Sequence, residues 1–69
     1  MFNREIGRRI RARRRYLEMS QESVARILRI PRPSVTHMED GTRKVTVYEV
    51  MILCQVFNVD LDYFYKGTL

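Results

Sequence analysis

A chain of 69 residues is long enough for one small domain, and its 45% hydrophobic content favours a folded chain over a disordered one. The net charge of +5 is uneven: residues 1–44 carry 12 Lys and Arg against 5 acidic residues, and residues 45–69 carry 1 against 3. The single cysteine excludes an internal disulfide and a cysteine-based zinc site, and no apolar run reaches the roughly 18 residues of a membrane span.

The first predicted helix covers about residues 3–17. Ile6, Ile10 and Leu17 fall within about 40° of one another on a helical projection, which predicts a narrow apolar stripe facing the core. The opposite side forms a basic ridge that we expect to be solvated: Arg4, Arg8, Arg11 and Arg15.

The second helix is predicted over about residues 21–28. Ser20 precedes it as an N-cap, because a serine hydroxyl can accept a hydrogen bond from one of the first free backbone N–H groups. Three small or apolar side chains at helical spacing are expected to face inward: Val24, Ala25 and Leu28.

The third helix is predicted from about Arg32 to Asp40. Pro33 is compatible with it, since a proline in the first turn gives up an N–H that has no partner within the helix. Gly41 then supplies the left-handed residue that ends the helix.

Two closing helices are predicted from their caps. Thr46 and Glu49 form a capping box, so the segment that follows opens a helix and is not a strand. Asn58 ends this helix in a left-handed conformation, and Asp60 caps a short fifth helix, LDYFY. The inner face of the fourth helix is expected to bury Val50, Leu53, Cys54 and Phe57.

Residues 21–40 combine two short helices across a turn of about three residues. Ala25 is small, which allows the next helix to cross closely and near a right angle. That crossing would project the start of the third helix as a ridge of a size that fits the roughly 12 Å major groove of DNA.

Residues 6–65 resemble the Cro/CI-type (XRE family) helix-turn-helix regulators, which are related to phage repressors. The resemblance rests on residues that occur together in register: Ser20, Gln21, Ala25, Val35, Glu39, Gly41, Val59, Asp60 and Leu61. It implies an all-α, compact five-helix lambda-repressor-like DNA-binding domain over residues 1–69, with a reading motif at about 21–40.

The same resemblance implies roles for individual residues. Groove-facing positions that touch base edges are held by Arg32, Pro33, Thr36 and His37. Positions that bind phosphate are held by Gln21 and Ser34, and a loop that meets the sugar-phosphate chain holds Arg43 and Lys44. Arg14 and Glu39 match a structural pair that joins the first helix to the end of the third.

Three positions depart from the family pattern. Glu18 and Arg29 stand where the family usually has glycine, so a left-handed conformation there would cost on the order of 1 kcal/mol each. Pro31 replaces the usual Ser or Thr cap of the third helix, so that cap is expected to come from elsewhere.

Sequence-specific binding of double-stranded DNA by a transcriptional regulator, a repressor rather than an activator, is therefore the expected function. A homodimer through the last two helices is expected, with some of a C-terminal aromatic cluster in the core and some in the interface with Tyr48 and Met51: Tyr63, Phe64 and Tyr65. The alternative is an antitoxin or a peptidase-linked regulator whose C-terminal helices also bind that toxin or peptidase.

Other classes of function lack the residues they need. One histidine, one cysteine and no glycine-rich loop argue against an enzyme, a metal site or a cofactor. Since the N-terminal sequence also lacks the apolar stretch of a secretory signal, we expect a soluble cytoplasmic protein with no membrane partner.

Overall fold

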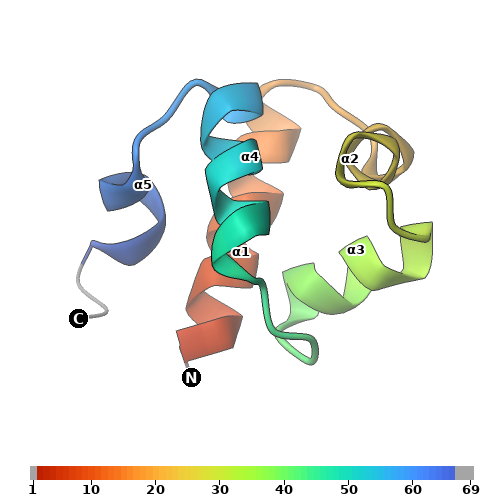
Figure 1. The fold of residues 1–69 in the computed structure, drawn as a ribbon, viewed down its shortest axis with the longest axis horizontal. Coiled ribbons are helices and arrows are strands. Elements are labelled where there is room, and N and C mark those ends of the chain that lie inside the picture. Colours follow the sequence, from red (N-terminus) through yellow and green to blue (C-terminus); the bar gives the residue numbers. More distant parts are fainter. Residues whose placement is uncertain (1, 67–69) are drawn as a thin grey trace.

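The computed structural model describes residues 2–66, which form five helices and no strand, confirming the all-α fold (Figure 1). The helices are α1 (Phe2–Tyr16), α2 (Gln21–Leu28), α3 (Arg32–Asp40), α4 (Val47–Phe57) and α5 (Leu61–Tyr65). In Figure 1, α4 lies in front of α1 at the centre, with α2 and α3 on one side of them and α5 on the other. None of the helices in this described part is long and apolar enough to cross a membrane.

The helix caps follow the local sequence. Ser20, Thr46 and Asp60 each accept a backbone hydrogen bond at the start of the next helix, and Glu49 completes the predicted capping box. The left-handed residues that end α2, α3 and α4 are Arg29 (φ 59°), Gly41 (φ 87°) and Asn58 (φ 56°). Pro31 has no side-chain capping bond, so the substitute cap expected for α3 is absent; the amide of Ser34 bonds the Pro31 carbonyl instead.

The end of α1 corrects the predicted apolar stripe. The helix stops at Tyr16, and Leu17 is 36% exposed rather than in line with Ile6 and Ile10. Glu18 takes the left-handed conformation (φ 57°), so the chain turns out of the helix at this point. Leu17 therefore lies in the turn, where the helical spacing that predicted its burial no longer applies.

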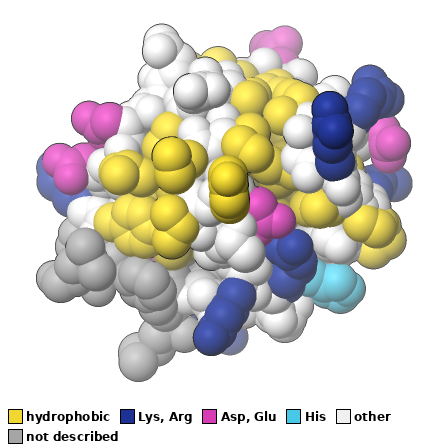
Figure 2. Space-filling view, in the orientation of Figure 1, with side chains coloured by type: hydrophobic (Ala, Val, Ile, Leu, Met, Phe, Trp, Pro, Cys, Tyr) yellow, Lys and Arg dark blue, Asp and Glu magenta, His cyan; other side chains and the backbone are white. Residues whose placement is uncertain are grey.

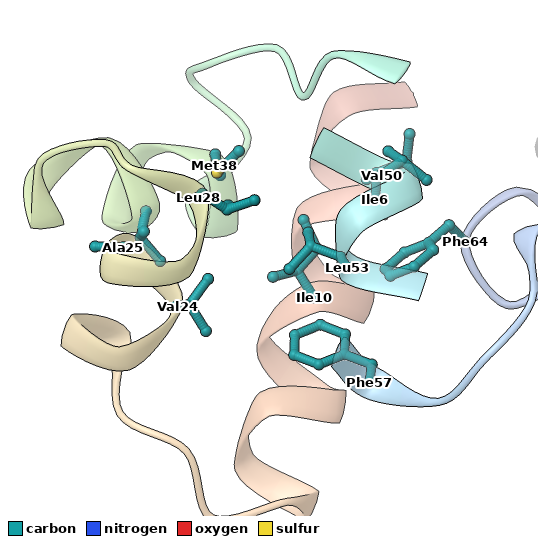
Figure 3. Close-up of a cluster of buried hydrophobic side chains, with 11 residues drawn as sticks. Ile6, Ile10, Val24, Ala25, Leu28, Met38, Val50, Leu53, Phe57 and Phe64 are labelled. Atoms are coloured by element: carbon teal, nitrogen blue, oxygen red, sulfur yellow. The ribbon is translucent and has the colours of Figure 1, made fainter. Parts of the chain in front are cut away.

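The core lies where α1, α2, α3, α4 and α5 meet (Figure 3). Ile10 of α1, Leu53 and Phe57 of α4 and Phe64 of α5 are fully buried and point toward one another. Val24, Ala25 and Leu28 face this cluster from α2, as predicted. Cys54 is only partly buried and packs against this cluster, so the prediction that Cys54 is buried is wrong.

A close crossing of α1 and α3 positions the reading motif. Gly7 of α1 is buried against the backbone of Met38 and Glu39, with no room for a Cβ atom. Glycine thus brings the end of α3 directly against α1. Because α2 also packs on α3, the orientation of α3 is set by two other helices.

Candidate nucleic-acid interface

The outward face of α3 presents four of the predicted reading residues together. Arg32, Pro33, Thr36 and His37 line one shallow, open hollow on the surface. The opposite face of α3 is anchored by Val35 and Met38, both fully buried. The burial of one face forces the other to be presented to solvent, because the register of a helix fixes both faces together.

Thr36 and Gln21 are joined across the helix-turn-helix. The hydroxyl of Thr36 lies 3.0 Å from Oε1 of Gln21, while Nε2 of Gln21 lies 3.0 Å from Oε1 of Glu39. The first residue of α2 therefore links the surface of α3 to a buried carboxylate. Gln21 is itself partly buried, at the N-terminus of α2.

Glu39 is the centre of a buried polar network. Its side chain has no exposed surface, and Arg14 approaches it with two nitrogens, Nε at 2.6 Å and Nη2 at 3.1 Å. Arg14 also donates to the carbonyl of Met19 at 2.9 Å, so it holds both α3 and the turn after α1. The two residues that the resemblance pairs are thus in contact.

The environment of Glu39 keeps the carboxylate ionised. Burial alone would raise the pKa of Glu39, but hydrogen bonds from Arg14 and Gln21, the positive charge of Arg14 and a hydrogen bond from Arg11 outweigh it. The pKa of Glu39 is therefore lowered from its ordinary value. An ionised carboxylate can only accept hydrogen bonds, which fixes the direction of every bond around it.

Arg11 does not belong to the solvated ridge expected on α1. Its Nε lies 3.5 Å from Oε1 of Glu39, and its side chain is 44% exposed. The helical projection placed Arg11 correctly away from the stripe of Ile6 and Ile10, but it could not show that α3 packs on that side of α1.

The loop after α3 carries two more predicted contact residues, one held in an ion pair and one exposed. Arg43 forms a two-pronged ion pair with Glu49, with distances of 3.1 and 3.0 Å, and its guanidinium therefore faces the start of α4. Lys44 is exposed. Hydrogen bonds from Arg43 and Thr46, together with the charge of Arg43, overcome the effect of burial and lower the pKa of Glu49.

His37 stands at the end of the hollow and contacts the α3 C-terminus. Its Nδ1 lies 3.2 Å from the hydroxyl of Thr42 and 3.8 Å from a carboxylate oxygen of Asp40. Ser34, the remaining predicted phosphate contact, is partly buried on α3. Among residues 2–66, no three His, Cys, Asp or Glu side chains come together as a metal site would require.

An exposed apolar surface lies on α4, away from the hollow. Val47 and Tyr48 (79% exposed), then Met51 (55%) and Ile52, recur at helical spacing, and Leu61 of α5 is also exposed. Figure 2 shows apolar side chains gathered over α4 on this face of the molecule. In contrast, the aromatic residues of α5 turn inward: Phe64 is buried, and the Tyr63 hydroxyl donates to the Arg9 carbonyl.

Two arginines of α1 have structural roles that the sequence did not reveal. Arg9 donates to the carbonyls of Tyr63 and Phe64, and Arg13 donates to the carbonyl of Phe57. Both satisfy carbonyls at the C-terminal end of a helix, where no intrahelical partner remains. Their only sequence signal is their position beside the apolar stripe, which does not identify such distant partners.

Comparison with known protein families matches residues 5–63 to the family described as "Helix-turn-helix domain". Antitoxin PezA of Streptococcus pneumoniae is 39% identical over 54 residues, which are 78% of this chain and 34% of PezA. HTH-type transcriptional regulators of Sinorhizobium medicae and Rhizobium meliloti, both described as uncharacterised, are 34% identical over 63 residues, 91% of this chain and 45% of theirs. The chain thus spans less than half the length of these relatives.

A solved structure has the same fold. The restriction-modification controller protein C.AhdI of Aeromonas hydrophila superposes with a TM-score of 0.79 at 24% sequence identity, over 88% of this chain and 92% of C.AhdI. At that identity the match establishes the arrangement of the helices and leaves the role of individual residues to the geometry described above.

Proposed function

Because this chain belongs to the helix-turn-helix domain family, in its Cro/CI-type (XRE) form, we propose that it reads double-stranded DNA as part of a transcriptional regulator. In this proposal α3 enters the major groove. The protein acts in the cytoplasm as a repressor by occupying its DNA site. The observation that carries the proposal is the hollow of α3, where Arg32, Pro33, Thr36 and His37 share one open face.

The charge distribution supports a polyanionic partner. Residues 1–44, which include α1, α2 and α3, carry 12 basic residues and only 5 acidic ones. Arg32 is exposed in the first turn of α3, where it can pair with guanine O6 and N7. Lys44 is exposed and free to reach a phosphate. Gln21, at the start of α2, can also contact a phosphate.

In this proposal Arg43 can contact DNA only after it gives up its ion pair with Glu49. Its two bonds to Glu49 hold it against α4, so a contact with phosphate replaces an ion pair rather than engaging a free side chain. We therefore expect Lys44 to contribute more than Arg43 to the electrostatic part of binding.

We also propose that two copies associate through the exposed surface of α4. One short helix reads only a few base pairs, so two copies would be needed to specify a site, about 34 Å apart along the DNA. Tyr48 and Met51 are of residue types enriched in such interfaces, and Val47 and Leu61 add exposed apolar surface beside them.

A second candidate is an antitoxin or peptidase-linked regulator in which the same α4 surface binds a toxin or a peptidase. It is favoured by the similarity to PezA, a protein named as an antitoxin, over 78% of this chain. The two candidates share the DNA-reading face and differ in what covers Tyr48 and Met51.

Selection of bound sites from random duplex DNA tests the proposal. We expect a pseudo-palindromic site and an affinity that falls steeply with salt, by a log–log slope of roughly 0.9 for each phosphate contact. Lys44→Ala is expected to weaken all sequences equally, and Lys66→Ala, at the far end of α5, serves as a matched control. An affinity that is independent of salt, or the failure of selection to enrich any sequence, would refute the proposal.

A further inference from the structure

The chain of hydrogen bonds from Glu39 through Gln21 to Thr36 determines which atoms Thr36 offers to a partner. Glu39 is fully buried beside Arg14 and Arg11, and its ionised carboxylate can only accept. The Gln21 atom 3.0 Å from it must therefore be the amide nitrogen. The identity of the two ends of this amide thus follows from the chemistry of its neighbour.

The other end of Gln21 then fixes Thr36. With its nitrogen turned to Glu39, the Gln21 amide presents its oxygen, which lies 3.0 Å from the Thr36 hydroxyl. A carbonyl oxygen has no proton to give, so Thr36 must donate its own. A threonine hydroxyl has one proton, and what remains for a partner is its lone pairs.

Thr36 is thus an acceptor on the face of α3 that lines the hollow with Arg32 and His37. We propose that Thr36 reads an exocyclic amino group in the major groove, N6 of adenine or N4 of cytosine, and discriminates against the acceptor edges of guanine and thymine. The inference rests on the proposed function and specifies the chemistry of that same site. Adenine and cytosine are the bases that present amino donors in that groove.

The same bonding pattern separates the roles of Thr36 and Gln21. Phosphate oxygens are acceptors, so a hydroxyl whose proton is committed to Gln21 gains nothing from the DNA backbone. Gln21 retains a second amide proton, because only one points to Glu39, and it can donate that proton to phosphate. Thr36 therefore contributes to specificity, and Gln21 contributes to affinity for any sequence and also holds Thr36 in its acceptor state.

The first experiment removes the acceptor and the amino group separately. Thr36→Val keeps the shape of the side chain without the hydroxyl, and Thr36→Ser keeps the hydroxyl. The selected site is prepared with one amino group at a time deleted, by placing purine for adenine or pyrimidin-2-one for cytosine. At one position we expect Thr36→Val and the deletion each to weaken binding by roughly 2- to 12-fold, and the two together no further.

The second experiment releases the Thr36 proton. Gln21→Met removes the amide oxygen, so the Thr36 hydroxyl becomes free to donate its proton. The ratio of affinities for an amino-bearing base over the other bases at that position should then fall toward one. Arg8→Met, at an exposed side chain of α1 that pairs only with Glu5, is the control and should leave the preference unchanged. Circular dichroism and thermal unfolding establish that each variant is folded before its affinities are compared.

The outcomes separate this inference from the proposed function. If the wild-type protein discriminates between sequences but Thr36→Val loses affinity equally for all of them, or Gln21→Met keeps the amino preference, the acceptor role of Thr36 is wrong and the proposed function stands. If the wild-type protein does not discriminate at all, the proposed function has failed. Coupled losses at one amino-bearing base, with Thr36→Ser close to wild type, support the inference.

Discussion

Replacing Arg14 with methionine tests how far the buried ion pair holds α1 and α3 together. The Arg14 side chain is 11% exposed and forms three hydrogen bonds, two with Glu39 and one with the Met19 carbonyl. Methionine fills similar space and removes the charge, which leaves a buried carboxylate without its main partner. Such an uncompensated charge costs about 3–5 kcal/mol, whereas an exposed pair contributes less than about 1 kcal/mol.

The remaining contacts of Glu39 place Arg14→Met at the lower end of that range. Arg11 lies 3.5 Å away and Gln21 3.0 Å away, so the carboxylate keeps part of its compensation. We therefore expect a loss of about 3 kcal/mol, or a decrease in Tm of about 12–24 °C for a domain of this size. Arg8→Met is the matched control, because Arg8 pairs with Glu5 on the surface, and we expect about 0.5 kcal/mol or less.

Urea unfolding followed by circular dichroism, at pH 7 and at lower pH, measures both effects. Because the pKa of Glu39 is lowered in the folded state, its contribution is complete above the unfolded pKa near 4.5 and is lost as the pH falls through the folded pKa. The difference between wild type and Arg14→Met should therefore narrow in acid, since protonation discharges the buried carboxylate. An equal and small loss for Arg14→Met and Arg8→Met, or a difference that does not change with pH, would refute this account.

Three further variants test other features of the structure. Glu18→Gly should raise the free energy of unfolding by about 0.5–1 kcal/mol, because Glu18 has φ 57°; an unchanged Tm would contradict that strain. Gly7→Ala should lower it by about 1–3 kcal/mol despite the better helix propensity of alanine, since its Cβ meets the α3 backbone; a gain on thermal unfolding would exclude the close crossing. Tyr48→Glu with Met51→Glu should shift a dimer to monomer in sedimentation while the helical spectrum is kept; a monomeric wild type would remove the proposed interface.

The sequence alone determined the helices and most of their ends, because these depend on interactions between residues that are close along the chain. Ser20, Thr46 with Glu49, and Asp60 cap helices as predicted, since a cap spans only three or so residues. The apolar spacing likewise identified most of the core. It failed at Leu17, because the chain left the helix one residue early, and at Cys54, because periodicity gives a direction and not a depth.

Only the tertiary structure decided which side chains of the candidate interface bond to one another. Arg11 joins Glu39, Arg43 folds back on Glu49, and Gln21 connects the buried carboxylate to Thr36, all through partners on other segments. Composition and a helical projection show that such side chains are polar and on which face of the helix they lie. They do not show which side chain of another helix bonds to them. Gly7 sets this geometry, since the absence of a Cβ atom lets α3 approach α1 and brings Glu39 within reach of Arg14.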